Sequence, residues 1–192
     1  MATPMTTSDA LANTTRALHD IGLAAWLGGS MFGKFALNPA VRLVGDKAER
    51  GKIVNGAWNG YNLVNSFGLG AVALGWVAAR ATEARGGQMT DAEHTLARVK
   101  DALVASAVVT GVASGVQGAR LAKQAPEGAV PIEDGTTPAP ETPAPAAKVQ
   151  RSLGVLGNVN IVTGLALAAV NAVLAQQSYS RPPLRRGLLR RA

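Results

Sequence analysis

The sequence predicts an all-α, polytopic membrane protein, with four transmembrane helices in an antiparallel bundle and a disordered Pro-rich loop between the third and fourth helices. Four long apolar blocks alternate with charged connectors along the 192 residues. The block from Ile53 to Ala79 contains no charged side chain, and as a helix it would be about 40 Å long, more than the hydrocarbon core of a bilayer. Trp58 and Trp76 would lie about 27 Å apart along that helix, a spacing typical of aromatic residues at the two membrane interfaces.

A soluble helical bundle is the competing fold. The apolar blocks are rich in Ala, Gly and Val, which also suits helices buried in a protein core. Four such blocks, each near or above the length of a membrane span, favour the membrane. We therefore expect one domain over residues 1–192, with helices at about 9–38, 53–80, 90–123 and 151–177.

The first predicted helix begins near Asp9, because Thr7 or Ser8 can act as its N-cap. Pro39 should end it, since the residue before a proline disfavours helical backbone. Its small and polar residues, His19 among them, share one face, and such a face normally packs on other helices. His19 and Asp20 are neighbours in sequence and should point in different directions, so we expect no acid–base pair.

A polar stripe runs along the second predicted helix. Asn55, Asn59, Asn62, Ser66 and Gly70 recur at spacings that place them within about 80° of one another on a helical wheel. One interpretation is that these groups form hydrogen bonds to neighbouring helices, each contributing about 0.5 to 1 kcal/mol. The other is that they line a polar pocket or path for a small ligand.

The third predicted helix opens with a capping box at Thr90 and Glu93. Its first turns are charged, which indicates a helix that begins outside the bilayer and then enters it. A second polar stripe there includes Thr110. On the fourth predicted helix Asn160 shares a face with Gly164 and Asn171. The candidate polar site within the membrane comprises His19, Asn59, Asn62, Ser66, Thr110 and Asn160.

Glycines at four-residue spacing predict close approach between helices. Three such pairs are candidates for helix packing: Gly29 and Gly33, Gly56 and Gly60, and Gly111 and Gly115.

Residues 124–150 are rich in Pro and Ala and carry almost no large apolar side chain, which predicts a disordered loop exposed to water. The tail at 181–192 carries five arginines and no acid. Beside a membrane it would lie on anionic lipid headgroups. A nucleic-acid partner is not expected, because no aromatic residue accompanies the arginines and the net charge of +7 is spread through every connector.

No catalytic motif is present: the chain has no HExxH, no GxSxG, no phosphate-binding GxxxxGK[ST] and no pair of carboxylates within an apolar block. The absence of Cys excludes disulfides, thiolate metal sites and thiol catalysis. We therefore expect no enzyme and no cofactor.

The first helix resembles one family of small membrane proteins. Leu18-His19, Trp26, Gly28-Gly29, Phe32 and Asn38-Pro39-Ala40 are similar to the opening helix of the CopD-like and DUF4149 (transmembrane protein 205-like) four-helix proteins. The resemblance covers about the first quarter of the chain. It implies a four-helix membrane fold and copper handling at His19. The chain has no Cys, and its second histidine, His94, lies in a polar segment, so the residues themselves predict neither a copper path nor a two-histidine haem.

Three functions remain open. The first is a non-enzymatic integral membrane protein that acts as a scaffold, assembly or accessory subunit through its small and polar helix faces, in a homo-oligomer or larger complex. The second is a carrier of a small molecule or ion, copper included, with a site lined by Asn, Ser and Thr. The third is a soluble helical scaffold that binds lipid or quinone. For the membrane protein we expect the plasma (inner) membrane. With four spans the arginine-rich tail and the acidic Pro-rich loop lie on opposite sides of the membrane, so we expect cytoplasmic termini and the loop on the outer side.

Overall fold

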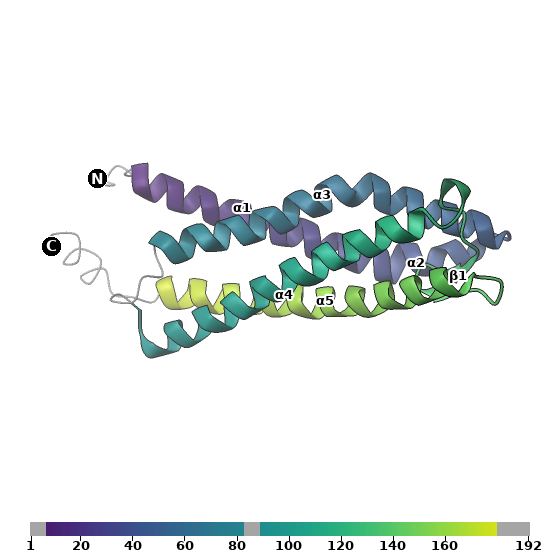
Figure 1. Ribbon diagram of the computed structural model, residues 1–192. Coiled ribbons are helices and arrows are strands. Elements are labelled where there is room, and N and C mark those ends of the chain that lie inside the picture. Colours follow the sequence, from purple (N-terminus) through teal and green to yellow (C-terminus); the bar gives the residue numbers. More distant parts are fainter. Residues whose placement is uncertain (1–6, 83–88, 180–192) are drawn as a thin grey trace, which may run out of the picture.

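The computed structural model describes residues 7–82 and 89–179. Four long helices form an elongated bundle: α1 (Thr7–Phe32), α3 (Lys47–Thr82), α4 (Asp91–Ala122) and α5 (Ala144–Tyr179) (Figure 1). Each helix runs opposite to the one before it, so the prediction of an all-α fold with four antiparallel helices is confirmed. The tail at 181–192 lies outside the described residues.

The bundle consists of two closely packed pairs. Helix α1 packs mainly on α3, and α4 packs mainly on α5, while contacts between the pairs are sparser. Helices α1 and α3 approach most closely where two glycines face each other, since a Cβ added at Gly68 would lie only 2.8 Å from the carbonyl oxygen of Gly22. The core between the pairs contains the buried side chains of Trp26, Val72 and Leu167.

Both tryptophans that the sequence placed at the membrane interfaces turn inward. Trp76 is 7% exposed and belongs to the core, and Trp58 is half-buried. The prediction that these two rings are interfacial anchors is therefore wrong, because both pack against neighbouring helices. The helical wheel explains the difference, because Trp58, Asn65 and Trp76 share the face of α3 that α1 and the neighbouring helices cover.

Pro39 does not end the first helix. After α1 the chain continues as a π-helix η1 (Gly33–Leu37), a short α2 (Asn38–Ala40) and a 3₁₀ turn η2 (Val41–Leu43). The backbone N–H of Asn38 bonds to the carbonyl of Gly33, which widens the turn just before the proline. Pro39 then occupies the first turn of α2, where its missing N–H is tolerated. The predicted stop at 38 is wrong for this reason.

The segment predicted to be disordered is folded. Residues 123–143, which we call the cap, contain a 3₁₀ turn η3 (Pro126–Gly128) and an antiparallel hairpin of β1 (Ile132–Asp134) and β2 (Thr137–Pro138). Val130 and Ile132 are each 2% exposed and form a small core of their own with Ala146 of α5. Helix α5 accordingly begins at 144 and not at 151. The cap covers the end of the bundle where α2 lies (Figure 1).

Three helices are long and apolar enough to cross a membrane: Lys47–Ala81 in α3, Asp91–Ala122 in α4 and Ala144–Gln177 in α5. Helix α1 is not among them, and Arg16, His19 and Asp20 interrupt its apolar run. The fold therefore has three candidate spans where the sequence predicted four.

The glycine contact between α1 and α3 predicts a clear stability difference. Gly68→Ala forces the two helix backbones apart, and we expect the free energy of unfolding to fall by about 1 to 3 kcal/mol. Gly70→Ala is the matched control on the same helix, since no atom lies within 4 Å of its added Cβ, and it should be neutral or stabilising by up to about 1 kcal/mol. Thermal unfolding in detergent micelles measures both, and equal effects would contradict the close contact.

Candidate functional site

A cavity of about 230 Å³ lies inside the capped end of the bundle. Helices α1, α3, α4 and α5 form its walls, and the cap contributes Gly128, Val130, Ile132, Gly135 and Thr136 as its roof. The cavity thus lies between the two helix pairs, where packing is sparser.

Small residues create this space. Helix α4 faces the cavity with Ser114, Gly115, Gly118 and Ala119, and α5 faces it with Gly157 among others. A Cβ added at Gly115, Gly118 or Gly157 would meet no atom within 4 Å. The cavity is therefore the volume that ordinary helix side chains would have filled.

Carboxamides dominate the polar part of the lining. A carboxamide offers two N–H donors and an oxygen acceptor, so these side chains can bind either kind of partner. They come from α2, α3 and α5: Asn38, Asn55, Asn59, Asn62, Asn65, Gln150 and Asn160.

Two of these carboxamides are buried with an unpaired oxygen. Asn38 is 7% exposed and Gln150 is 1% exposed, and neither Asn38 Oδ1 nor Gln150 Oε1 has a hydrogen-bond partner among the described residues. The other end of Gln150 is fixed, because its Nε2 donates to the carbonyl of Asp134 at 2.8 Å. A buried acceptor without a donor costs about 1 to 3 kcal/mol. Both oxygens are themselves buried, so a donor in the cavity could reach them only if neighbouring atoms shifted.

The structure brings three of the six candidate polar residues to the cavity wall: Asn59, Asn62 and Asn160. Asn160 is also held by α4, since Thr110 Oγ1 lies 2.5 Å from its Oδ1 and its Nδ2 donates to Ser114 Oγ at 3.1 Å. Thr110 does not line the cavity itself but helps to hold Asn160 in position there. Ser66 is exposed on α3 and does not line the cavity.

His19 belongs to a second polar cluster, away from the cavity. Its Nδ1 lies 3.1 Å from Asp20 Oδ1 and 3.3 Å from Asn171 Nδ2, so the expectation that His19 and Asp20 do not meet is wrong. The Asp20 carboxylate reaches back to the ring because Asn171 of α5 donates to the same oxygen at 2.5 Å. His19 is 3% exposed, and its Nε2 has no partner among the described residues.

Lys100 completes this second cluster, and its burial was not predicted from the sequence pattern. It is 4% exposed, bonds to Asn171 Oδ1, and places Nζ 4.3 Å from the centre of the Trp76 ring. The Trp76 indole donates to Asp101 at 2.8 Å, and Asp101 pairs with Arg80 at 3.0 Å. An amide oxygen and an aromatic face thus replace part of the water that the ammonium loses on burial.

The six candidate packing glycines divide into two groups. Gly29 lies against the Tyr61 ring, Gly33 against the Trp58 ring, and Gly111 against the Leu69 side chain. A Cβ added at Gly56, Gly60 or Gly115 would have no neighbouring atom within 4 Å. The closest backbone contact of the bundle, Gly22 with Gly68, does not follow the four-residue spacing.

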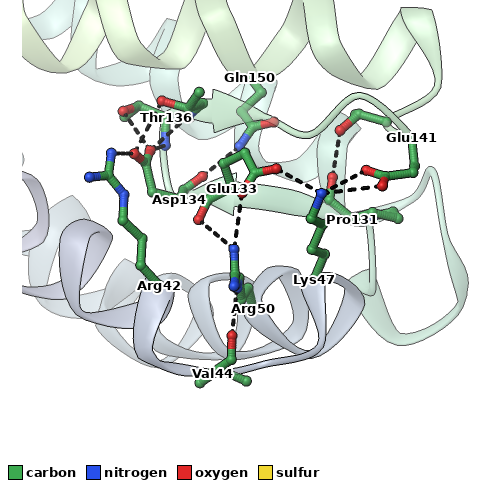
Figure 2. A network of polar contacts seen from close by, with 12 residues as sticks. Arg42, Val44, Lys47, Arg50, Pro131, Glu133, Asp134, Thr136, Glu141 and Gln150 are labelled. Atoms are coloured by element: carbon green, nitrogen blue, oxygen red, sulfur yellow. Dashed lines mark hydrogen bonds and ion pairs between the residues drawn. The ribbon is translucent and has the colours of Figure 1, made fainter.

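Ion pairs fasten the cap to the chain between η2 and the start of α3 (Figure 2). Arg42 pairs with Asp134, and Arg50 Nη1 bonds to Glu133 Oε2 at 3.1 Å. Lys47 lies between two carboxylates, 2.8 Å from Glu133 and 3.2 Å from Glu141. Because hairpin residues also form the roof of the cavity, these contacts keep the cavity closed at that end.

The carboxylates of the cap are held in their charged forms. Burial by itself raises the pKa of Asp134, but the Thr136 N–H, the Arg42 guanidinium and the Thr136 and Thr137 hydroxyls outweigh it, and the pKa lies below its ordinary value. The hydrogen bond from Lys47 lowers the pKa of Glu133. Charge pairing therefore stabilises the attached cap at neutral pH.

Sequence reasoning missed Lys34, Asn38 and Gln150 as lining residues. Asn38 was treated only as the residue before a proline, and Gln150 fell in the segment predicted to be disordered. The signal that could have found them is the one that marked Asn59 and Asn62, a carboxamide at the edge of an apolar helix. In the described ranges no three His, Asp or Glu side chains gather to hold a metal ion.

Comparison of the chain with known protein families, curated proteins and solved structures finds no match.

The lowered pKa values in the cap predict how its attachment depends on pH. A carboxylate with a depressed pKa in the folded state stabilises that state above its unfolded pKa, and the contribution is lost as the pH falls through the folded pKa. We expect amide protection at residues 131–137 to be full at pH 6 to 7 and to fall below about pH 4. Hydrogen exchange measures this, with residues 104–114 of α4 as the control. Protection of the hairpin that does not change down to pH 3 would contradict the ion-pair attachment.

Proposed function

We propose that this chain is a four-span integral membrane protein without enzymatic activity that binds a small polar molecule in the amide-lined cavity. The observation that carries the proposal is a cavity lined by seven carboxamides, two of which, Asn38 and Gln150, have a buried side-chain oxygen with no hydrogen-bond partner in the described chain. Such a constellation of convergent polar groups in a cavity is typical of a ligand site. Its location among long apolar helices favours a carrier or receptor over a soluble binding protein.

The outward faces of the bundle support the membrane assignment. Large apolar side chains are exposed along the candidate spans, with Leu63 at 80%, Leu74 at 72%, and Val109 and Val162 at 67% exposure. Water-soluble monomers rarely expose continuous apolar surface of this kind. Helix α1 packs mainly on α3 and would cross with it as the fourth span.

We place the protein in the plasma (inner) membrane. The cap carries four carboxylates, whereas the C-terminal tail, at 181–192, carries five arginines, and the two segments would lie on opposite sides of a four-span protein. Basic segments favour the cytoplasmic side. The proposed orientation therefore has cytoplasmic termini and the cap on the outer side.

A second candidate function is that of an accessory or scaffold subunit. The observation that favours it is the pair Gly56 and Gly60 on α3. A Cβ added at either glycine would meet no atom of the described chain within 4 Å, so a helix of another subunit could pack closely there. Copper handling at His19, which the first-helix resemblance implies, is no part of the proposal. His19 shares Asn171 with the Lys100 ammonium, an unsuitable neighbour for a cationic metal.

The membrane assignment predicts the outcome of a fractionation. We expect the chain to remain in the pellet when membranes are washed with alkaline carbonate and to be released by detergent, because lipid covers the exposed apolar faces of α3, α4 and α5. Recovery of the chain in the carbonate supernatant, monodisperse without detergent, would favour the soluble alternative.

The ligand proposal predicts that the purified chain retains a small molecule that a filled cavity excludes. Gly118→Leu places a side chain in the open space of the cavity, whereas Gly60→Leu adds the same volume outside the cavity, so it serves as the control. Native mass spectrometry of the detergent-solubilised chain should show a bound mass that persists in the control and is lost from Gly118→Leu. Asn59→Leu with Asn62→Leu should weaken the same retention. Identical spectra for all variants would favour the accessory-subunit function.

A further inference from the structure

We infer that the cavity takes the headgroup of an anionic, hydroxylated phospholipid, which enters sideways from the bilayer between α3 and α4. The inference rests on the proposed function and names the class of ligand. It is carried by where the cavity opens, how deep that opening lies and which groups line the interior.

The opening lies between α3 and α4. Of the residues lining the cavity, the exposed ones are Asn59 and Asn62 of α3 and Gly115 and Ala119 of α4. The roof is more closed than this side, because Gly128, Val130 and Ile132 of the cap are buried, and Gly135 and Thr136 are half-buried. A ligand that cannot pass the cap must enter from the side, and on that side α3 and α4 are two of the candidate spans.

The depth of the opening matches the headgroup layer. Asn59 is about 10 Å from Lys52 along α3, and Ala119 is the neighbour of Arg120 on α4. On the other side of the opening both helices continue without charge towards the opposite interface. The opening therefore lies where the charged end of the bundle meets its charge-free part, as the polar region of a bilayer meets its hydrocarbon core.

The interior favours an anion. Lys34 is the charged side chain among the described lining residues; it is half-buried, and no carboxylate faces it from the cavity wall. An ammonium in such surroundings binds a phosphate by a charge-assisted hydrogen bond. The carboxamide N–H groups of α3 add donors for the remaining phosphate oxygens.

The carboxamides at the opening favour a headgroup that also carries hydroxyl groups. A phosphodiester offers no donor at neutral pH, so a phosphate alone would give the carboxamide oxygens of Asn59 and Asn62 no donor. A glycerol headgroup carries two hydroxyls beyond its phosphate and can donate to these oxygens. A choline headgroup has no donor and carries a cation, which Lys34 repels.

Native mass spectrometry of the full chain, solubilised in detergent and mixed with phosphatidylglycerol and phosphatidylcholine in equal amounts, tests this inference. We expect phosphatidylglycerol to be retained about tenfold over phosphatidylcholine, and Lys34→Gln to lower that retention about tenfold. Lys148→Gln is the matched control, because Lys148 is exposed at the same end of the bundle and does not line the cavity. Gly118→Leu should remove the bound lipid and Gly60→Leu should not.

Several results would overturn the inference. One is equal retention of the two lipids, or equal losses in Lys34→Gln and Lys148→Gln, which would indicate lipid held on the outer surface only. Another is binding of soluble glycerol phosphate as tight as that of the lipid, which would indicate a ligand from the water phase. A non-lipid mass that Gly118→Leu excludes would overturn the lipid inference while leaving the proposed function standing. Thermal unfolding of each variant confirms that it is folded.

Discussion

Polar side chains inside long uncharged helices need partners, because a bilayer supplies none, and this constraint organises the structure. The chain meets it in two ways and leaves it unmet in one place. Thr110, Ser114 and Asn160 bond to one another across α4 and α5. The Tyr61 hydroxyl donates to the carbonyl of Ala25 at 2.8 Å and joins α3 to α1. At the cavity the constraint is left unmet, and an unmet acceptor inside an apolar fold is where a ligand gains most from binding.

The helices pack closely within each pair, and this arrangement leaves the cavity between the pairs. Close glycine contact draws α1 onto α3, and a polar ladder draws α4 onto α5. Between the pairs, small residues on α4 leave a gap near the cap, while the bulky Leu69 closes on Gly111 further along. The cavity is thus a product of residue size along one helix. The cap shuts it towards the water and leaves the side between α3 and α4 open.

Periodicity was sufficient to predict the long helices and the polar stripe of α3, because a charge-free run of this length is typical of a membrane-spanning or buried helix. The spacing of Asn59 and Asn62 left two interpretations open, hydrogen bonds to neighbouring helices or a polar pocket, because the pocket depends on which neighbouring residues are small. The burial of Lys100 was not predictable, since it depends on Asn171 and Trp76 from two other helices. Such a contact leaves no trace in the local sequence.

The cap shows where composition misleads. A segment rich in Pro and Ala buries little surface by itself, which is why it reads as disordered. Here Val130 and Ile132 pack on the ends of helices that were already formed, and basic residues between 42 and 52 supply partners for its carboxylates. The order of the cap therefore comes from a surface far away in sequence, which analysis of the segment alone does not reveal.

The central claim is that lipid covers the outward faces of α3, α4 and α5. The chain has no cysteine, so single cysteines can be introduced and spin-labelled without further changes. In liposomes, nitroxides at Leu63→Cys, Val109→Cys and Val162→Cys should collide more with oxygen than with a water-soluble nickel complex, and a nitroxide at Glu141→Cys in the cap should show the reverse. Nickel access at the three helix positions equal to that at the cap would contradict the account.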